Sequence, residues 1–357
     1  MIENSEHFRS VIFNEILLRL DNERLTNNWV SRGPQYGDEF SQRTQFHLTQ
    51  LGYFLEAYQD LFSTFLALGD IQSKRLFMSI ILYRLIGHSK IRIQENETTK
   101  TISQRRAALE SQISKTPSKF SLSVSDDTAL VHMEGFKHGG KEVLLDSQGP
   151  AIFDHSFLTR QYFYSPDETF SARPGDFVID AGACLGDTAV AFSLAVGQKG
   201  KVFSFDPLSA HCAVAEFNAT QNGLDNISVH QQGLGETGNG VPIKKNSIDR
   251  VLPGFNPDTV SNKISITSID EFVENHQIEK IDFIKMDIEG WELRALKGAR
   301  STINKYGPKL AICLYHKFSD FVEIPQWLTA NFPDYEFRLG HYTIFEDETV
   351  LYAKKRQ

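Results

Sequence analysis

The sequence predicts an α/β protein in which a doubly wound, mostly parallel sheet follows a mainly helical N-terminal region. Three observations lead to this prediction. After about residue 150, short apolar runs alternate with amphipathic helical segments, as in parallel sheets covered by helices. Before that point, apolar residues recur at helical spacing over long stretches. Several of the later apolar runs also end in an acidic residue, and one of these is followed by two glycines.

Length and composition set limits on the organisation of the chain. Its 357 residues are enough for two domains with separate cores, which we place at 1–150 and 151–357. The net charge of −8 argues against a nucleic-acid partner, because phosphate backbones bind basic surfaces. Three scattered cysteines make neither a disulfide framework nor a zinc motif, and no apolar run is long enough to span a membrane. Since the first twenty residues mix charges with apolar positions, unlike a signal peptide, we expect a cytoplasmic protein.

The region 1–150 is expected to be helical and to end in a small β segment. Lys137-His-Gly-Gly140 is typical of a turn between two strands. The predicted elements are helices at 2–20, 43–67 and 71–86, a weak helix within 94–119, and strands at 129–136 and 142–145. This stretch of sequence contains no metal or nucleophile motif. Packing against the second domain, homo-oligomerisation through the helices and shaping of a substrate cleft are therefore all open roles.

The region 151–357 alternates strands and helices. Its strand-like runs are short and apolar, as expected of strands that are buried on both faces of a sheet. The predicted strands are 177–180, 201–205, 227–230, 281–286 and 309–315, followed by a hairpin of 335–344 and 349–354. The predicted helices include 187–196, one that ends near 221, 291–306 and 319–330. Ser268 and Glu271 form a capping box, which predicts one further helix start.

Polar side chains stand at the carboxyl ends of the predicted strands, where ligands of doubly wound sheets bind. These residues are Asp180, Asp206, Asp287, Glu289 and His316. Gly182 and Gly186 follow the first strand, and glycine there allows a positive φ and a close approach to a ligand. Asp206 comes about twenty residues after this turn, the separation at which a carboxylate contacts a ribose, so a nucleoside is predicted on the first two strands.

The glycines and acids of this turn distinguish two kinds of nucleoside ligand. NAD usually requires G-x-G-x-x-G, because the backbone must hold a pyrophosphate. Here the spacing is G-x-x-x-G, Asp180 and Asp187 add negative charge, and the turn contains no basic residue. An acidic turn repels a pyrophosphate and tolerates a sulfonium and an ammonium, so the sequence favours S-adenosylmethionine over NAD.

Several motifs of the second region match those of a known family. They are 175–188, 200–207, the block Ile281-Asp-Phe-Ile-Lys-Met-Asp-Ile-Glu-Gly290 with 296–298 behind it, 310–316 and 348–352. In these motifs, residues 173–354 resemble the FkbM family of S-adenosylmethionine-dependent methyltransferases. The resemblance implies a class I methyltransferase-like, Rossmann-like sheet of seven strands with an antiparallel terminal hairpin. It also implies methylation of a hydroxyl group on a sugar, a glycan or a glycosylated natural product.

The resemblance further implies roles for single residues toward the cofactor S-adenosylmethionine and its product S-adenosylhomocysteine. Asp206 would hold the ribose, and the backbone of Leu234 would contact the adenine. The residues implied at or beside the methionine end are Asp180, Gly182, Ala183, Gly186 and Asp287.

Methyl transfer to a hydroxyl needs an aligned acceptor and gains rate from a base. His316 and Asp287 are both candidates for that base, and Glu289 and His341 are candidate substrate-binding residues. Asp287 and Glu289 would point the same way if the strand continued through them, whereas acids before a helix also serve as caps. A divalent metal is left open, and no metal ligand is assigned. Lys285 needs a partner if it is buried, and Asp282 is a candidate.

Three functions are compatible with these observations. The first is an S-adenosylmethionine-dependent methyltransferase that acts on a small-molecule or glycan acceptor. The second is a catalytically inactive scaffold that binds the cofactor and recruits a partner through its helical region. The third is an NAD-dependent oxidoreductase.

Overall fold

The structure is a computed structural model that describes residues 2–20, 40–87, 91, 93, 99–120, 129–236, 264–343 and 347–356. Its strands are β1 (Ser114–Pro117), β2 (Val131–His138), β3 (Lys141–Ser147), β4 (Phe177–Ala181), β5 (Lys201–Phe205), β6 (Ile227–His230), β7 (Gly233–Leu234), β8 (Ile266–Thr267), β9 (Phe283–Met286), β10 (Lys309–Cys313), β11 (Tyr335–His341) and β12 (Thr349–Lys355). Its helices of at least six residues are α1 (Ser5–Leu20), α2 (Phe40–Ala67), α3 (Ile71–Ile86), α4 (Thr99–Gln112), α6 (Asp187–Val196), α7 (Ser209–Gln221), α9 (Ile269–Asn275), α10 (Glu292–Lys297), α11 (Arg300–Tyr306) and α12 (Asp320–Asn331).

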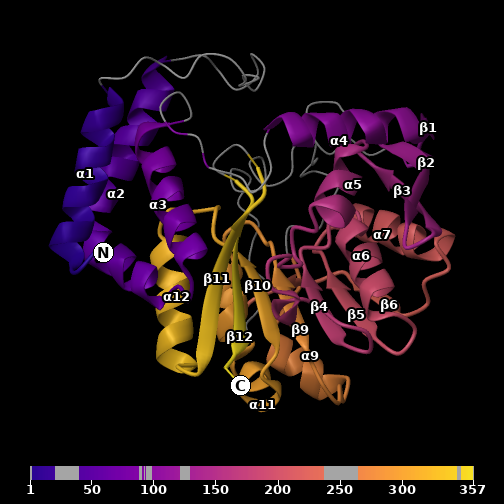
Figure 1. Cartoon of the computed structure of the whole chain (residues 1–357). Helices are drawn as coiled ribbons and strands as arrows, with labels where there is room; N and C mark the ends of the chain where they lie inside the picture. Colours follow the sequence, from indigo (N-terminus) through magenta and orange to yellow (C-terminus); the bar gives the residue numbers. More distant parts are fainter. Residues whose placement is uncertain are drawn as a thin grey trace. The chain divides into compact units, whose positions relative to one another are not determined.

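A seven-stranded sheet is the main feature of the fold, in the order β11-β12-β10-β9-β4-β5-β6 (Figure 1). Adjacent strands from β10 to β6 are parallel. From β4 the chain continues through β5 and β6 on one side, whereas β9 and β10 lie on the other side. The strand order therefore reverses between β4 and β9, where an open α/β sheet binds its ligands. This architecture confirms the predicted mixed α/β fold with a helical N-terminal region.

Two compact units make up the chain, and each is described by itself. Unit 1 consists of Met1–Ile102, Leu314–Leu351 and Arg356–Gln357, and unit 2 consists of Ser103–Cys313 and Tyr352–Lys355. The domain boundary near residue 150 stays a prediction.

Unit 1 is built on the helices that the apolar spacing predicts. Phe8 of α1 is fully buried against α2, with its ring centroid 5.8 Å from that of Phe62 and 5.7 Å from that of Phe65. Asp70 caps α3 as expected, because its carboxylate accepts from Ser73 N at 2.8 Å. Within the described residues, no helix is both long and apolar enough to cross a bilayer.

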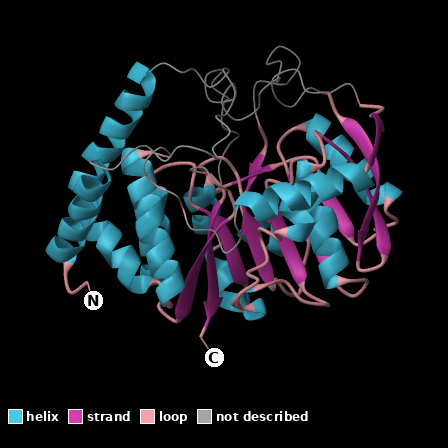
Figure 2. Cartoon of the chain, turned by 45° about the horizontal axis from the view of Figure 1, so that its top comes forward, coloured by secondary structure: helices cyan, strands magenta, loops and turns pink. Residues whose placement is uncertain are grey.

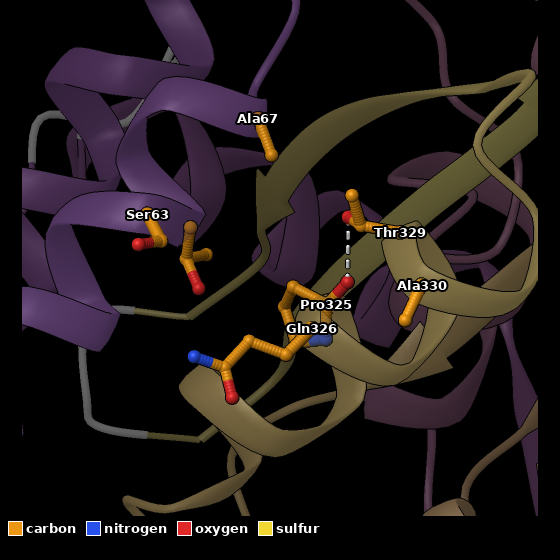
Figure 3. Close-up of a pocket in the computed structure, with 7 residues that line it drawn as sticks. Ser63, Ala67, Pro325, Gln326, Thr329 and Ala330 are labelled. Atoms are coloured by element: carbon orange, nitrogen blue, oxygen red, sulfur yellow. Dashed lines mark hydrogen bonds between the residues drawn. The ribbon is translucent and has the colours of Figure 1, made fainter.

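A small pocket of about 210 Å³ lies between α2 and α12 in unit 1 (Figure 3). The polar side chains of its wall already bond within the protein: Thr64 Oγ1 donates to Phe321 O at 2.9 Å, and Thr329 Oγ1 donates to Pro325 O at 2.8 Å. The wall carries no acidic or basic side chain, and its three hydroxyl groups donate to backbone carbonyls. The pocket therefore offers no acid–base chemistry, whereas unit 2 has carboxylates at its strand ends.

Unit 2 combines the parallel strands with a small antiparallel sheet of β1, β2 and β3 (Figure 2). β4 is buried at every position, which explains its continuous apolar sequence. Asn218 of α7 is fully buried, donates to the carbonyls of Asp146 (3.0 Å) and Leu185 (2.7 Å), and accepts from Asp146 N at 2.8 Å. One asparagine thus joins the end of β3 to the turn before α6.

Among the differences from the sequence-based expectation are one helix and one strand. The helix predicted over 291–306 is divided into α10 and α11, because the backbone at Gly298 passes close to the Gly235 carbonyl; a Cβ on Gly298 would lie 2.1 Å from that oxygen. β1 was not predicted, since its four residues are all exposed and follow no apolar pattern.

Candidate functional site

Three carboxylates gather at the carboxyl ends of three adjacent strands of unit 2. Asp180 is the last residue but one of β4. Asp206 directly follows β5, and Asp287 directly follows β9. β4 lies between the other two strands in the sheet. The switch point of the strand order is therefore lined with acids, as the sequence suggested.

A buried lysine holds the end of β4. Lys285 is 1% exposed, and its Nζ lies 3.1 Å from Asp180 Oδ1 while donating to the carbonyls of Ala181 at 3.1 Å and Gly182 at 2.7 Å. Burial alone would lower the pKa of Lys285, but the Asp180 and Asp287 carboxylates raise it above its ordinary value. The ammonium is therefore charged at neutral pH and fixes the backbone where the turn begins.

The expected pairing of Lys285 with Asp282 is wrong. Asp282 instead contacts Lys280 at 3.0 Å on the surface, and Lys285 faces Asp180 because the two are direct partners in the β4–β9 register. The other Asp180 oxygen accepts from Thr188 Oγ1 at 2.8 Å. Asp180 is fully buried, so its carboxylate organises the turn from the interior.

Four of the five backbone N–H groups in the turn from Gly182 to Gly186 donate hydrogen bonds within the protein. The donors and acceptors are Gly182 N to Phe205 O (2.9 Å), Ala183 N to Phe205 O (3.0 Å), Cys184 N to Asp206 Oδ2 (3.2 Å) and Gly186 N to Ala183 O (2.7 Å). A pyrophosphate site needs such groups to point at the ligand. This turn uses them for its own structure.

Glycine is required at both ends of this turn. Gly182 has a φ of +79°, and a Cβ there would lie 1.8 Å from the carbonyl oxygen of Asp287. Gly186 has a φ of +84° and precedes α6, where a Cβ would lie 2.7 Å from Ala215 of α7. The two glycines let the ends of β4 and β9 meet and let α6 approach α7.

Asp206 is the centre of a polar cluster. Its carboxylate accepts from Cys184 N at 3.2 Å and from Leu208 N at 2.9 Å, and it lies 3.2 Å from His211 Nδ1. Burial alone would lower the pKa of His211, but the neighbouring Asp206 and Cys184 side chains raise it to about 10. His211 was not among the predicted site residues, although a histidine five residues after a strand-end acid, at the start of a helix, can indicate such a contact.

Asp287 has a partner that the sequence did not indicate. Tyr162, which is 6% exposed, donates its hydroxyl to Asp287 Oδ2 at 2.7 Å and accepts from Gln161 Nε2 at 3.1 Å. The ring of Tyr162 also lies 5.0 Å from Lys285 Nζ. Glu292 of α10 is fully buried, and one of its carboxylate oxygens lies within 4.8 Å of a carboxylate oxygen of Asp287. No sequence signal joins Tyr162 to a residue 125 positions away.

The idea that Asp287 and Glu289 share one strand direction is wrong, because β9 ends at Met286. Glu289 is exposed in a left-handed turn with a φ of +58°. The N-cap of α10 is Trp291, whose side chain makes no capping bond.

Asp187, the first residue of α6, is buried beneath the turn. Its carboxylate accepts from the Ser156 hydroxyl. Burial raises the pKa of Asp187 to about 6, although Ser156 and Lys285 lower it. The negative charge that Asp187 adds to the turn therefore depends on pH.

Leu234, His316 and His341 are the other residues that the sequence predicts for the site. Leu234 is 3% exposed in β7, where it pairs with Thr267 of β8. His316 and His341 belong to unit 1: the His316 ring lies 4.2 Å from that of Tyr315, and His341 Nδ1 lies 2.9 Å from Thr349 Oγ1.

Comparison with known proteins supports this reading of the fold. Residues 180–339 match the model of the methyltransferase FkbM domain. The methyltransferase FkbM from Methylobacillus flagellatus KT is similar in structure, with 20% identity and a TM-score of 0.51 over 85% of this chain and 60% of that chain. This chain thus spans less than two thirds of that protein, and at this identity the likeness concerns the fold.

Weaker likenesses involve other solved methyltransferases, and none of the curated proteins compared matches the chain. The O-methyltransferase from Bacillus cereus in complex with SAH has 13% identity and a TM-score of 0.38, over 74% of this chain and 93% of that one. A SAM-dependent methyltransferase from Aquifex aeolicus has 18% identity and a TM-score of 0.34, over 58% and 97%. These two scores are too low to add weight. The family model and the sheet topology agree over residues 180–339, the part of the chain that matches the methyltransferase FkbM domain.

Proposed function

We propose that unit 2 binds S-adenosylmethionine at the carboxyl ends of β4, β5 and β9 and transfers its methyl group to a hydroxyl of a sugar, a glycan or a glycosylated metabolite. The observation that supports this most is the turn from Gly182 to Gly186, which combines internally bonded N–H groups with the carboxylates of Asp180, Asp206 and Asp287. The hydroxyl acceptor rests on the family resemblance.

The carboxylates around this turn suit a nucleoside that ends in a sulfonium and an ammonium. Carboxylates attract cationic groups, and a strand-end acid such as Asp206 accepts hydrogen bonds from ribose hydroxyls. Asp206 Oδ2 receives the Cys184 N–H, and each carboxylate oxygen accepts more than one bond. We assign the ribose to Asp206, the methionine end to Asp180, Gly182, Ala183, Gly186 and Asp287, and the adenine to the backbone of Leu234.

The same turn disfavours an NAD-dependent oxidoreductase. A pyrophosphate carries negative charge that needs N–H donors or a cation. Lys285, a cation beside the turn, is buried and donates to the carbonyls of Ala181 and Gly182. We therefore expect NAD to bind much more weakly than S-adenosylhomocysteine.

The cofactor supplies a methyl group that is already activated by positive sulfur, so the protein mainly has to align the acceptor and accept its proton. Tyr162 donates its hydroxyl to one oxygen of Asp287 and so orients that carboxylate, and each carboxylate oxygen can accept more than one hydrogen bond. We propose Asp287 or His316 as the base, and Glu289 and His341 as contacts to the acceptor. A positioned base contributes about 10²–10⁴ in rate.

Release of S-adenosylhomocysteine in the presence of a panel of sugars and glycosylated small molecules tests this function. Asp287→Asn and His316→Asn distinguish the two bases: the true base loses at least about 100-fold in kcat, while the other variant keeps more than a tenth of it. Cofactor binding with no turnover on any acceptor would favour the inactive-scaffold alternative. Heat released on titration with NAD, and none with S-adenosylhomocysteine, would overturn the proposal.

A further inference from the structure

Two consecutive arginines of α4 meet one buried carboxylate in unit 2. Arg105 Nε lies 2.5 Å from Asp154 Oδ1, and Arg106 Nε lies 2.9 Å from Asp154 Oδ2. The side chain of Asp154 is 1% exposed, whereas that of Arg106 is 44% exposed. One arginine is enough to neutralise a carboxylate, so the second leaves a net positive charge at this place.

The guanidinium of Arg106 is held from one side and keeps donors for a ligand. Within the described residues, it contacts Asp154 through Nε and His155 Nε2 through Nη2, the latter at 3.2 Å. An arginine carries five N–H donors and no acceptor, so His155 Nε2 accepts and three donors of Arg106 remain. Such donors form the planar fork that binds carboxylate and phosphate oxygens.

A further arginine follows on the same stretch of chain. Arg160 Nη1 lies 3.3 Å from Glu168 Oε1, and both side chains are at least one third exposed. Burial first, and then the charge of Arg160, lowers the pKa of His138 in β2 below its ordinary value. We call Arg105, Arg106, His155 and Arg160 the basic cluster. Because the whole chain carries a net charge of −8, this local excess of basic groups favours an anionic ligand here.

The stretch that carries the basic cluster also contacts the candidate functional site. Residues Asp154–Leu158 form a single turn of π-helix, an element that is frequent at functional sites. Within this turn, the Ser156 hydroxyl donates to Asp187 at the start of α6. Farther along, Tyr162 donates to Asp287 at 2.7 Å. The segment 154–162 therefore links the basic cluster to the turn before α6 and to a candidate base.

We infer that the basic cluster binds an oxyanion of the methyl acceptor, which is then a sugar that carries a carboxylate or a phosphate group. Arg106 supplies the fork of N–H donors, and Asp154 holds it in position. The inference rests on the proposed methyl transfer for the identity of the ligand as an acceptor, and it adds the charge of that acceptor. Carboxylate and phosphate groups share the oxygen geometry that a guanidinium recognises, so the experiment separates them.

Calorimetric titration of the full chain with glucose, glucuronate and glucose 6-phosphate, at one ionic strength and without cofactor, tests the inference. Glucose is the neutral reference, glucuronate carries the carboxylate, and glucose 6-phosphate carries the phosphate. We expect at least one charged sugar to bind at least about tenfold more tightly than glucose, and Arg106→Gln to weaken its binding at least about tenfold. Arg173→Gln, at an exposed arginine of the same unit, is the matched control and should bind as the wild type does.

Equal binding of the three sugars, or no measurable binding of any, would overturn the inference, as would equal affinity in Arg106→Gln and the wild type. Since Arg105 keeps its contact with Asp154, we expect Arg106→Gln to fold, which circular dichroism checks. If it does not fold, Arg106→Lys, which keeps the charge and loses the planar fork, takes its place, and an unchanged affinity there also overturns the inference. Binding of S-adenosylhomocysteine without a preference for charged sugars would contradict this inference and leave the proposed function standing.

Discussion

Replacement of Lys285 by methionine is the most informative perturbation of the fold around the turn. The substitution removes the ion-pair partner of Asp180 and the donor to the Ala181 and Gly182 carbonyls, and leaves a carboxylate with no exposed surface. Loss of one partner from a buried pair typically costs about 3–5 kcal/mol. We expect Lys285→Met to lower the free energy of unfolding by this amount.

Urea unfolding followed by circular dichroism, with linear extrapolation to water, measures the change. Lys280→Met is the matched control, because that lysine pairs with Asp282 at 3.0 Å on the surface, with side chains 40% and 31% exposed, and should lose less than about 1 kcal/mol. In the double variant Lys285→Met/Asp180→Asn, no charge is left unpaired, so the two losses should be clearly less than additive. Additive losses, or a Lys285→Met effect no larger than the control, would refute the reasoning.

Three further outcomes follow from the turn and its surroundings. A residue other than glycine in the left-handed region costs roughly 1–2 kcal/mol. Gly182→Ala should lower the free energy of unfolding in urea by more than this, because the new Cβ would also clash with the Asp287 carbonyl. Gly223→Ala, at a φ of +63° with open space around it, should lower the free energy of unfolding by the conformational cost alone. The folded-state pKa of Asp187, about 6, lies above its ordinary 3.8, so its stabilising contribution is complete below about pH 3.8 and is lost as the pH rises through 6. Asp187→Asn should therefore raise stability at pH 7.5, by up to about 3 kcal/mol, and leave it unchanged at pH 3.5. Asn218→Ala should lower the unfolding free energy by about 1–3 kcal/mol and speed amide exchange in β3, and unchanged exchange there would contradict its linking role.

Much of the parallel sheet could be predicted, because buried strands and amphipathic helices have distinct periods. β5, β6 and α6 have the bounds that the sequence suggests, and β4 is longer by one residue. The division of α10 from α11 could not be predicted, since it depends on the approach of Gly235, more than fifty residues earlier, to Gly298.

The sequence predicts where the strand-end acids of the site lie, but it does not predict which residues they contact. Asp180 meets Lys285 because β4 and β9 pair in a register that sequence does not state. Tyr162 reaches Asp287 from a segment before the sheet begins, and only the tertiary fold joins them. Sequence therefore indicates where polar groups end a strand, whereas the buried network that orients them follows from packing.

Calorimetric titration of the full chain with S-adenosylhomocysteine and, separately, with NAD tests the central claim most directly. We predict binding of S-adenosylhomocysteine, a loss of about 10–100-fold in affinity in Asp206→Asn, and no change in the exposed control Asp225→Asn. NAD should release no measurable heat. Equal affinity in Asp206→Asn and the wild type, or tighter binding of NAD than of S-adenosylhomocysteine, would contradict a nucleoside–sulfonium site on β4 and β5.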